Sequence, residues 1–440
     1  MGFEKRYYHH RGITVIQKLD PSLPRLRPGK VGLVLAGGAV AGGAYKAGGL
    51  RALNEAFRRR KAPGQGPLPF SLNDFDLFVG LSAGSILAAV LSAGIHPDEI
   101  FRILRGTSET YIPFAARHFM RPNWFEMVDR VTLHAERQHE LFTNWLSGAT
   151  DPRTGRSFSL RATLGKMVSA SSRLLPTGIF DPVALEEYLR ENMRRAGLSD
   201  DFADAFRRTG KALYLSAADL NRGEMIVFGH DEPYAKVPIS KAIAASCAIP
   251  IWYKPMLIDN PLAGEPGEPE RLDLADGGLM RTANVRLAVE KGCELVICYN
   301  PFRRIRYDRA GRSLYEHGLP TLVSQAARTL IGARLDIAKE LVYRDETVEA
   351  DIVFIEPAED DYTFFNMNMM NFWGKDRASE HGYAAVRRSL ESNHELLAAL
   401  FRVHGIELWD FDRRSPPSVE SRRQPRLNES RTQSARRRRE

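Results

Sequence analysis

The chain has 440 residues, of which 43 % are hydrophobic and 26 % are charged, and its formal net charge is +8 at pH 7. These proportions are typical of a globular protein with one large or two modest domains. Ten Arg and three Glu give residues 413–440 a net charge of +7, which leaves +1 for residues 1–412. The basic character therefore lies in the tail, and we expect no nucleic-acid-binding fold.

Residues 1–30 contain three prolines and scattered charge, and they predict an extended lead-in with one strand at 13–16. The start lacks the apolar core of a secretory signal, and no apolar window is long enough for a transmembrane helix. Cys247, Cys293 and Cys298 lie in apolar strings without zinc spacing, which favours reduced thiols. We expect a cytoplasmic protein, with peripheral contact to a membrane left open.

Two strand–turn–helix patterns dominate the first hundred residues. Residues 31–36 are an apolar run of strand length that leads through a glycine-rich loop into a helical pattern over 44–60. Residues 75–79 predict a second strand, followed by a sharp Gly-Leu-Ser-Ala-Gly turn and a helix over 85–93. A Gly-x-Ser-x-Gly turn between strand and helix is typical of a nucleophile elbow. Ser82 is therefore a candidate nucleophile, and Gly80 and Gly84 would permit the tight turn.

The glycine-rich loop at Gly37-Gly38 supplies what an acyl-transfer serine needs, namely backbone N–H groups near a developing oxyanion. The same glycines match no dinucleotide fingerprint, and Gly43 is followed by Ala44 where a P-loop needs Lys. We therefore exclude both nucleotide-binding interpretations.

The rest of the chain returns to strands and helices after a break. Residues 107–180 mix aromatic and charged side chains with weak periodicity, and they predict a helical insertion over the site. Further strands are expected at 212–218, 225–228, 256–258, 272–275, 295–299 and 351–355. Helices are expected at 183–195, 240–247, 319–342 and 378–403. Such repeats predict a parallel sheet covered by helices.

A serine nucleophile needs a base, and the best candidate is acidic. Asp276 ends an apolar strand and precedes Gly277-Gly278, where a carboxylate within hydrogen-bond reach of the hydroxyl would accept its proton. Asp273 lies inside the same strand and should not matter. His317 is the one histidine that we keep as an alternative base. His381, His394 and His404 fall in or at the end of a predicted helix, where packing or surface roles are expected.

Together these motifs resemble those of the patatin-like phospholipases. The glycine-rich loop, the Gly-x-Ser-x-Gly turn and the Asp-Gly-Gly stretch come in the family's order. Residues 244–250, AASCAIP, resemble the family's Ala-Ser-x-Ala-x-Pro block, and Asn284 resembles an asparagine usually found there. The similarity covers about residues 32–301.

The resemblance implies a three-layer α/β/α sandwich with a mostly parallel central sheet, and lipid acyl hydrolysis without a metal or organic cofactor. It implies a Ser82–Asp276 dyad without histidine, with Gly277 and Gly278 in support. The implied oxyanion hole consists of the backbone of Gly37, Gly38 and Ala39 with the N–H of Ala83. We expect a patatin-like domain over residues 31–412 and a disordered Arg-rich tail over residues 413–440.

The glycine-rich loop departs from the family's pattern. Ala39 stands at the family's third glycine, and no basic residue occurs between Gly37 and Tyr45. Alanine keeps its N–H, so the oxyanion hole would survive. A cation at the missing position would have steadied the loop or an anionic head group, so the preference for phospholipids is left open.

Residues 362–373, YTFFNMNMMNFW, are dense in aromatic and Met side chains. Core packing, an acyl-chain channel, membrane contact and a subunit interface all fit this composition. We expect a lipid substrate and transient contact with a membrane surface, and the sequence does not indicate an oligomeric state.

Two other functions fit part of the pattern. A histidine-dependent α/β-hydrolase esterase would need His317 near Ser82. A catalytically silent lipid-binding or scaffold protein with the same fold would be compatible with the altered glycine-rich loop.

Overall fold

The computed structural model describes residues 5–20, 29–61, 66–147, 176–303, 313, 316 and 318–409. Residues Met1–Leu408 form one unit, and Trp409–Glu440 form a second, of which only Trp409 is described. The tail predicted over residues 413–440 therefore lies outside the described residues, and so does His317.

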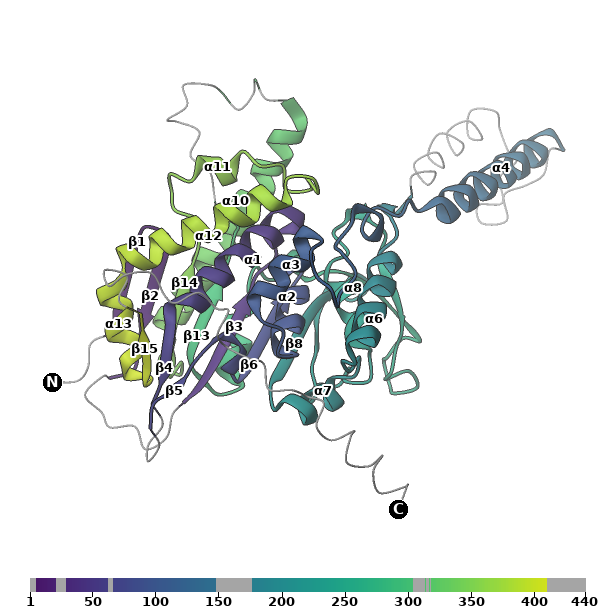
Figure 1. Cartoon of the computed structure of the whole chain (residues 1–440). Coiled ribbons are helices and arrows are strands. Elements are labelled where there is room, and N and C mark those ends of the chain that lie inside the picture. The colour runs from purple at the N-terminus through teal and green to yellow at the C-terminus, as the bar shows by residue number, and fades with distance from the viewer. Residues whose placement is uncertain are drawn as a thin grey trace, which may run out of the picture. The chain divides into compact units, whose positions relative to one another are not determined.

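Ten strands form one central sheet (Figure 1). In spatial order they are β1 (Arg6–His10), β2 (Ile13–Gln17), β14 (Asp351–Ile355), β13 (Cys293–Tyr299), β3 (Lys30–Leu35), β6 (Leu77–Leu81), β8 (Ala212–Asp219), β12 (Arg271–Asp276) and β11 (Met256–Asp259), while β9 (Glu224–Phe228) pairs with β8. The run from β14 to β8 is parallel, and the strands at both edges are antiparallel. The central strands are buried along their length, as expected for parallel strands covered on both faces. The prediction of a mostly parallel sheet is confirmed.

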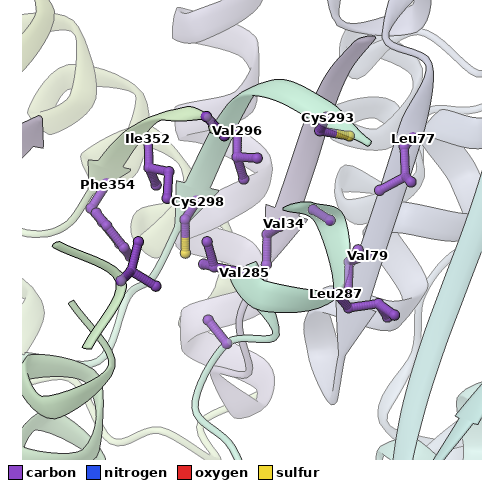
Figure 2. Packing of buried hydrophobic residues seen from close by; sticks show 14 of the residues in the cluster. Val34, Leu77, Val79, Val285, Leu287, Cys293, Val296, Cys298, Ile352 and Phe354 are labelled. Carbon is purple, nitrogen blue, oxygen red and sulfur yellow. The ribbon is translucent and has the colours of Figure 1, made fainter. Parts of the chain in front are cut away.

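Helices cover both faces of this sheet. Tyr299 of β13 contacts Tyr45 of α1 (Ala39–Ala56), with ring centroids 6.3 Å apart. Successive strand residues point to opposite faces, and Cys298 joins an apolar cluster with Val285 of α9 (Val285–Glu290) and Leu335 of α10 (Gly318–Arg344). Figure 2 shows this cluster from close by. The three-layer arrangement is therefore confirmed.

The remaining helices and strands have the following bounds. The longer helices are α2 (Ala83–Ser92), α3 (Pro97–Arg105), α4 (Trp124–Leu146), α6 (Val183–Ala196), α7 (Phe202–Thr209), α8 (Ile239–Ser246), α12 (Lys375–Ser392) and α13 (His394–Val403). The short ones are η1 (Leu72–Asp74), η2 (Ala116–His118), η4 (Gly277–Leu279) and α11 (Tyr362–Phe365). Two small sheets join β10 (Ile251–Tyr253) to β7 (Gly178–Phe180), and β15 (Ile406–Leu408) to β4 (Phe57–Arg60) and β5 (Leu68–Pro69).

The N-terminal segment contributes to the sheet before residue 31. The predicted strand at 13–16 is confirmed as β2, which pairs with β14. The hairpin partner β1 was not predicted, because all five of its residues, RYYHH, are exposed and show no apolar pattern.

The predicted bounds of two helices are wrong. The helix expected over 44–60 begins at Ala39 and ends at Ala56, because Phe57 turns into strand β4 and packs against Phe70 and Phe401. The helix expected over 378–403 is two helices that break at Asn393. The Asn393 side chain donates to the main chain at its own helix end and to the His10 carbonyl (3.2 Å), which stabilises the break.

The predicted insertion at 107–180 contains η2 and α4, and residues 148–175 of it lie outside the described residues. Among the helices that the structure describes, none combines the length and apolar character needed to cross a bilayer.

Candidate active site

Ser82 lies at the turn from β6 into α2. Its backbone φ of 53° is unusual for a residue other than glycine, and such a conformation costs about 1–3 kcal/mol. The flanking glycines are required by close contacts: a Cβ atom on Gly80 would lie 2.5 Å from the Ser85 Cα atom, and one on Gly84 would lie 2.1 Å from the Leu35 carbonyl oxygen. The predicted sharp turn is therefore present, and it holds Ser82 in a strained conformation.

Asp276, the last residue of β12, lies beside Ser82. Its carboxylate accepts a hydrogen bond from the Gly278 N–H (2.7 Å), and the Ser82 hydroxyl lies near enough to favour the ionised form. Burial raises the pKa of Asp276 to about 6, while the Ser82 hydroxyl, the Gly278 N–H and the charge of Lys46 act in the opposite direction. The structure thus brings together two predicted site residues that are far apart in sequence. Asp273 lies within β12, opposite Leu257 of β11.

Hydrogen bonds with residues at and just after the end of α8 hold Ser82 and Asp276 in place. The Ser246 hydroxyl accepts a hydrogen bond from the Ser82 N–H (2.8 Å) and donates one to the Ser216 carbonyl (2.7 Å). The Asp276 N–H donates to the Ala248 carbonyl (2.9 Å). The sequence singled out residues 244–250 only by resemblance, and the role of Ser246 was missed because its contacts are long-range.

The glycine-rich loop adjoins Ser82. A Cβ atom on Gly37 would lie 3.2 Å from the Ser82 Cβ atom. Ala39 begins α1 and Ala83 begins α2, so their N–H groups belong to the first turns of two helices, where N–H groups lack intrahelical partners. Within the described residues, the N–H groups of Gly37, Gly38, Ala39 and Ala83 have no hydrogen-bond acceptor. Such groups can receive an anionic oxygen.

Ala39 has a φ of 48°, in the left-handed region that favours glycine. This conformation explains why the family's pattern has a glycine there.

Lys46 is a site residue that the sequence analysis missed. It is completely buried, and its ammonium donates to the carbonyl oxygens of Ala36 and Gly37, the latter at 3.2 Å. Burial lowers the pKa of Lys46 to about 7. The signal in the sequence was a single lysine directly after Tyr45, in a helical stretch of small and apolar residues.

An apolar cavity of about 150 Å³ adjoins Ser82. One wall follows α2 through Ile86 and Ala89 to the C-cap residue Ala93, and this spacing places the three on one face. The ten residues of α2 span about 15 Å at 1.5 Å per residue. The cavity therefore runs from the serine along the length of this helix.

Polar side chains in the cavity wall bond to the main chain. The Tyr188 hydroxyl donates to the Ile112 carbonyl (3.0 Å), and the Asn192 amide donates to the Tyr188 carbonyl (3.0 Å). The Lys375 ammonium donates to the Leu104 carbonyl. These contacts leave an apolar surface facing the cavity, suited to a hydrocarbon chain.

The described histidines that the sequence analysis assigned to packing have structural partners. His404 is buried against Asp351, with Nε2 and Oδ2 2.8 Å apart, and His381 lies 2.6 Å from an oxygen of Asp361. In the described part of the chain, no group of three His, Cys, Asp or Glu side chains is arranged to hold a metal ion.

The segment 362–373 divides between core and surface. Phe364, Phe365 and Phe372 are buried, and Phe372 stacks on Phe114 with ring centroids 5.0 Å apart. Trp373 is 80 % exposed. Met370 lines the cavity, so the segment contributes to its wall.

The chain matches a family model described as "Patatin-like phospholipase" over residues 33–289. No curated protein matches it. Among solved structures, it is similar to VipD from Legionella pneumophila, with 16 % identity, a TM-score of 0.34, and coverage of 92 % of this chain and 71 % of VipD.

Two further similar structures are the human GIVD cytosolic phospholipase A2 and the Pseudomonas aeruginosa type III secretion protein ExoU in complex with SpcU. The human enzyme has 11 % identity and a TM-score of 0.41, with coverage of 86 % of this chain and 60 % of its own length. ExoU has 17 % identity and a TM-score of 0.27, with coverage of 90 % of this chain and 69 % of its own length.

Proposed function

The chain belongs to the patatin-like phospholipase family, and from this membership we propose that it is a serine hydrolase that cleaves acyl esters of lipids, with Ser82 as nucleophile and Asp276 as its base. The observation that supports this best is the position of the Ser82 hydroxyl near the buried Asp276 carboxylate, whose pKa it lowers, at one end of an apolar cavity. A buried, partly desolvated carboxylate with a pKa near 6 suits a general base at neutral pH.

In the proposed reaction, Asp276 takes the hydroxyl proton as the Ser82 oxygen attacks the ester carbonyl carbon. The N–H groups of the Gly37–Ala39 loop and of Ala83 stabilise the negative oxygen of the tetrahedral intermediate. The bond to the alcohol then breaks, and protonated Asp276 returns the proton to the departing alcohol oxygen. Water attacks the acyl-enzyme with Asp276 again as base, which releases the fatty acid and restores the Ser82 hydroxyl.

The cavity favours a lipid substrate over a short polar ester. Its wall along α2 would cover an acyl chain bound through its carbonyl at Ser82. At about 0.8 kcal/mol per buried CH₂, this burial gives longer chains a binding advantage.

We also propose transient contact with a membrane surface beside the cavity. Ile251 and Trp252 of β10 are 75 % and 39 % exposed, and their neighbour Tyr253 lines the cavity. Trp373 follows Met370, another lining residue. Exposed apolar side chains that flank an apolar cavity fit a lipid surface as the partner.

The test compares Ser82→Ala and Asp276→Asn with wild type on a p-nitrophenyl ester and in labelling by a fluorophosphonate probe. Ser82→Ala should fall to the uncatalysed background and lose labelling. Asp276→Asn should lose about 10²- to 10⁴-fold in kcat, the usual contribution of a general base. Asp273→Asn is the matched control and should keep wild-type activity.

Full activity in Ser82→Ala or Asp276→Asn would contradict the dyad. Replacement of His317 by Ala separates the dyad from a histidine-dependent esterase, since only the latter would lose activity. Wild-type protein that neither turns over esters nor reacts with the probe would instead indicate a silent binding protein.

A further inference from the structure

We propose that Lys46 is a positioning residue that orients the peptide groups of the Gly37 loop for oxyanion binding, and this inference rests on the function proposed above. The loop itself contains no basic side chain between Gly37 and Tyr45. Lys46 lies in the second turn of α1, and helical side chains tilt toward the helix N-terminus. This tilt carries its ammonium back to the loop.

The contacts of Lys46 determine the direction of the loop's N–H groups. Its ammonium donates to the Ala36 and Gly37 carbonyl oxygens. The C=O and N–H of a trans peptide point in opposite directions. Fixing these two carbonyls therefore turns the N–H groups of Gly37 and Gly38 away from Lys46, and these are N–H groups without an acceptor among the described residues.

Other hydrogen bonds hold the two ends of the loop without involving the carbonyl oxygens of Ala36 and Gly37. The Ala36 N–H donates to the Tyr299 carbonyl (3.1 Å), and the Ala41 N–H donates to the Met369 carbonyl (3.0 Å). In the part of the chain that the structure describes, only Lys46 bonds to the carbonyl oxygens of Ala36 and Gly37. The orientation of these two peptide groups thus depends on one side chain.

The burial of Lys46 differs from that of a structural ion pair. Lys339 is also buried, but its ammonium contacts the carboxylate of Glu356. For Lys46, no carboxylate lies within ion-pair distance among the described residues, and its bonds go to neutral carbonyls. An unpaired buried charge is costly to the folded state, so the position of Lys46 against the loop that adjoins Ser82 favours a role in catalysis.

Three titratable groups face the ammonium: Cys247 beyond α8, Cys298 of β13 and Asp276 of β12. Burial lowers the pKa of Lys46 to about 7, and the negative charge of Asp276 acts in the opposite direction. Burial also raises the pKa of both thiols, that of Cys247 to about 12, so they are neutral at this pH. As the pH rises through about 7, Lys46 loses its positive charge behind the loop. In return, the charge of Lys46 lowers the pKa of Asp276.

The experiment measures kcat, KM and their pH profiles for Lys46→Met and Lys46→Gln on a soluble p-nitrophenyl ester. We expect Lys46→Met to lower kcat at pH 6.5 by about 10- to 100-fold, somewhat less than the loss of one oxyanion donor, with KM changed less than threefold. Lys46→Gln keeps a donor for the carbonyls and should recover part of kcat. In both variants the alkaline fall in activity near pH 7 should vanish, and the acid limb should move to higher pH.

Tyr45→Phe is the matched control, because it removes a buried polar atom from the neighbouring position of α1 without touching the loop. It should keep the wild-type pH profile. Thermal unfolding of each variant shows whether it is folded, and a folding defect alone would lower the amount of active protein without removing the alkaline limb.

Wild-type kcat and an unchanged alkaline limb in both Lys46 variants would overturn the role of Lys46 and leave the dyad intact. Absence of turnover in the wild type, with Ser82→Ala no different, would instead overturn the proposed function, and the role of Lys46 with it.

Discussion

At the residue scale, the charge of Asp276 is decided by two opposing effects. Burial favours the neutral acid, whereas the Ser82 hydroxyl and the Gly278 N–H favour the carboxylate, and burial dominates to give a pKa of about 6. The ordinary value is 3.8. The folded protein therefore retains a proton, between about pH 4 and pH 6, that the unfolded chain releases.

This difference predicts how stability depends on pH. The protonated carboxyl stabilises the folded state fully below the unfolded pKa, and this contribution is lost as the pH rises through about 6. A shift of about two pKa units corresponds to roughly 3 kcal/mol. Asp276→Asn lacks the titration, so its free energy of unfolding relative to wild type should rise by about 2–3 kcal/mol between pH 4 and pH 7.5.

Urea unfolding of both proteins across this pH range checks the prediction. Asp273→Asn should follow the wild-type curve, because Asp273 is not part of the buried pair. Parallel curves for wild type and Asp276→Asn would show that Asp276 does not titrate differently in the folded state.

At the scale of elements, local patterns predicted more than long-range contacts did. The strand–turn–helix units around Gly37 and Ser82 could be predicted because strand, turn and helix signals follow one another within short windows. Asp276 was found for the same reason, since it ends an apolar strand before two glycines. The adjacency of Ser82 and Asp276 was inferred through the family resemblance.

The features that the sequence did not disclose depend on distant partners. Lys46 has an ordinary helical position, and its role depends on where its ammonium ends relative to two carbonyls. Ser246 is one of several small residues in α8, and only its bonds to Ser82 and Ser216 distinguish it. The break at Asn393 likewise depends on a contact with the N-terminal hairpin.

The cavity along α2 predicts that the side chain at position 89 controls the length of the acyl chain that the protein accepts. Ala89 lines it midway along the helix, and a phenyl group at this position would fill space beyond the serine. Ala89→Phe should leave turnover of acetyl esters within about threefold but lower kcat/KM for palmitoyl esters more than tenfold. Excluding three methylenes costs about 2.4 kcal/mol at about 0.8 kcal/mol each, which is more than tenfold.

Comparison of p-nitrophenyl esters from acetyl to palmitoyl checks this prediction. Ala203→Phe, at an exposed position of α7, controls for the added aromatic group. Equal losses on short and long esters would mean that Ala89→Phe disturbs the site rather than the path of the chain.

At the scale of the whole molecule, the exposed apolar side chains near the cavity raise the question of what covers them. Ile251 has a φ of 76° and is 75 % exposed, and a positive φ is strongly disfavoured for a β-branched residue. Its neighbour Trp252 stacks on Phe180 of β7, with ring centroids 6.3 Å apart. Ile251 is thus both strained and exposed, next to the cavity wall. This combination fits a surface that contacts lipid better than a surface that only stabilises the fold.

Trp373 provides the sharpest test of membrane contact. Phe372 is unsuited to it, because this side chain is buried against Phe114 and its loss would disturb the core. Trp373 is 80 % exposed, so Trp373→Ser should leave stability and turnover of a soluble ester unchanged. Inserting one large apolar side chain into lipid contributes about 1.5–3 kcal/mol, so binding to phosphatidylcholine vesicles and hydrolysis of their lipid should both fall about tenfold or more.

Leu68→Ser removes a side chain of 59 % exposure from β5, which contributes no residue to the cavity, and should change neither measurement. If Trp373→Ser lowers activity equally on vesicles and on the soluble ester, this tryptophan acts on the site itself, and membrane contact must be assigned elsewhere.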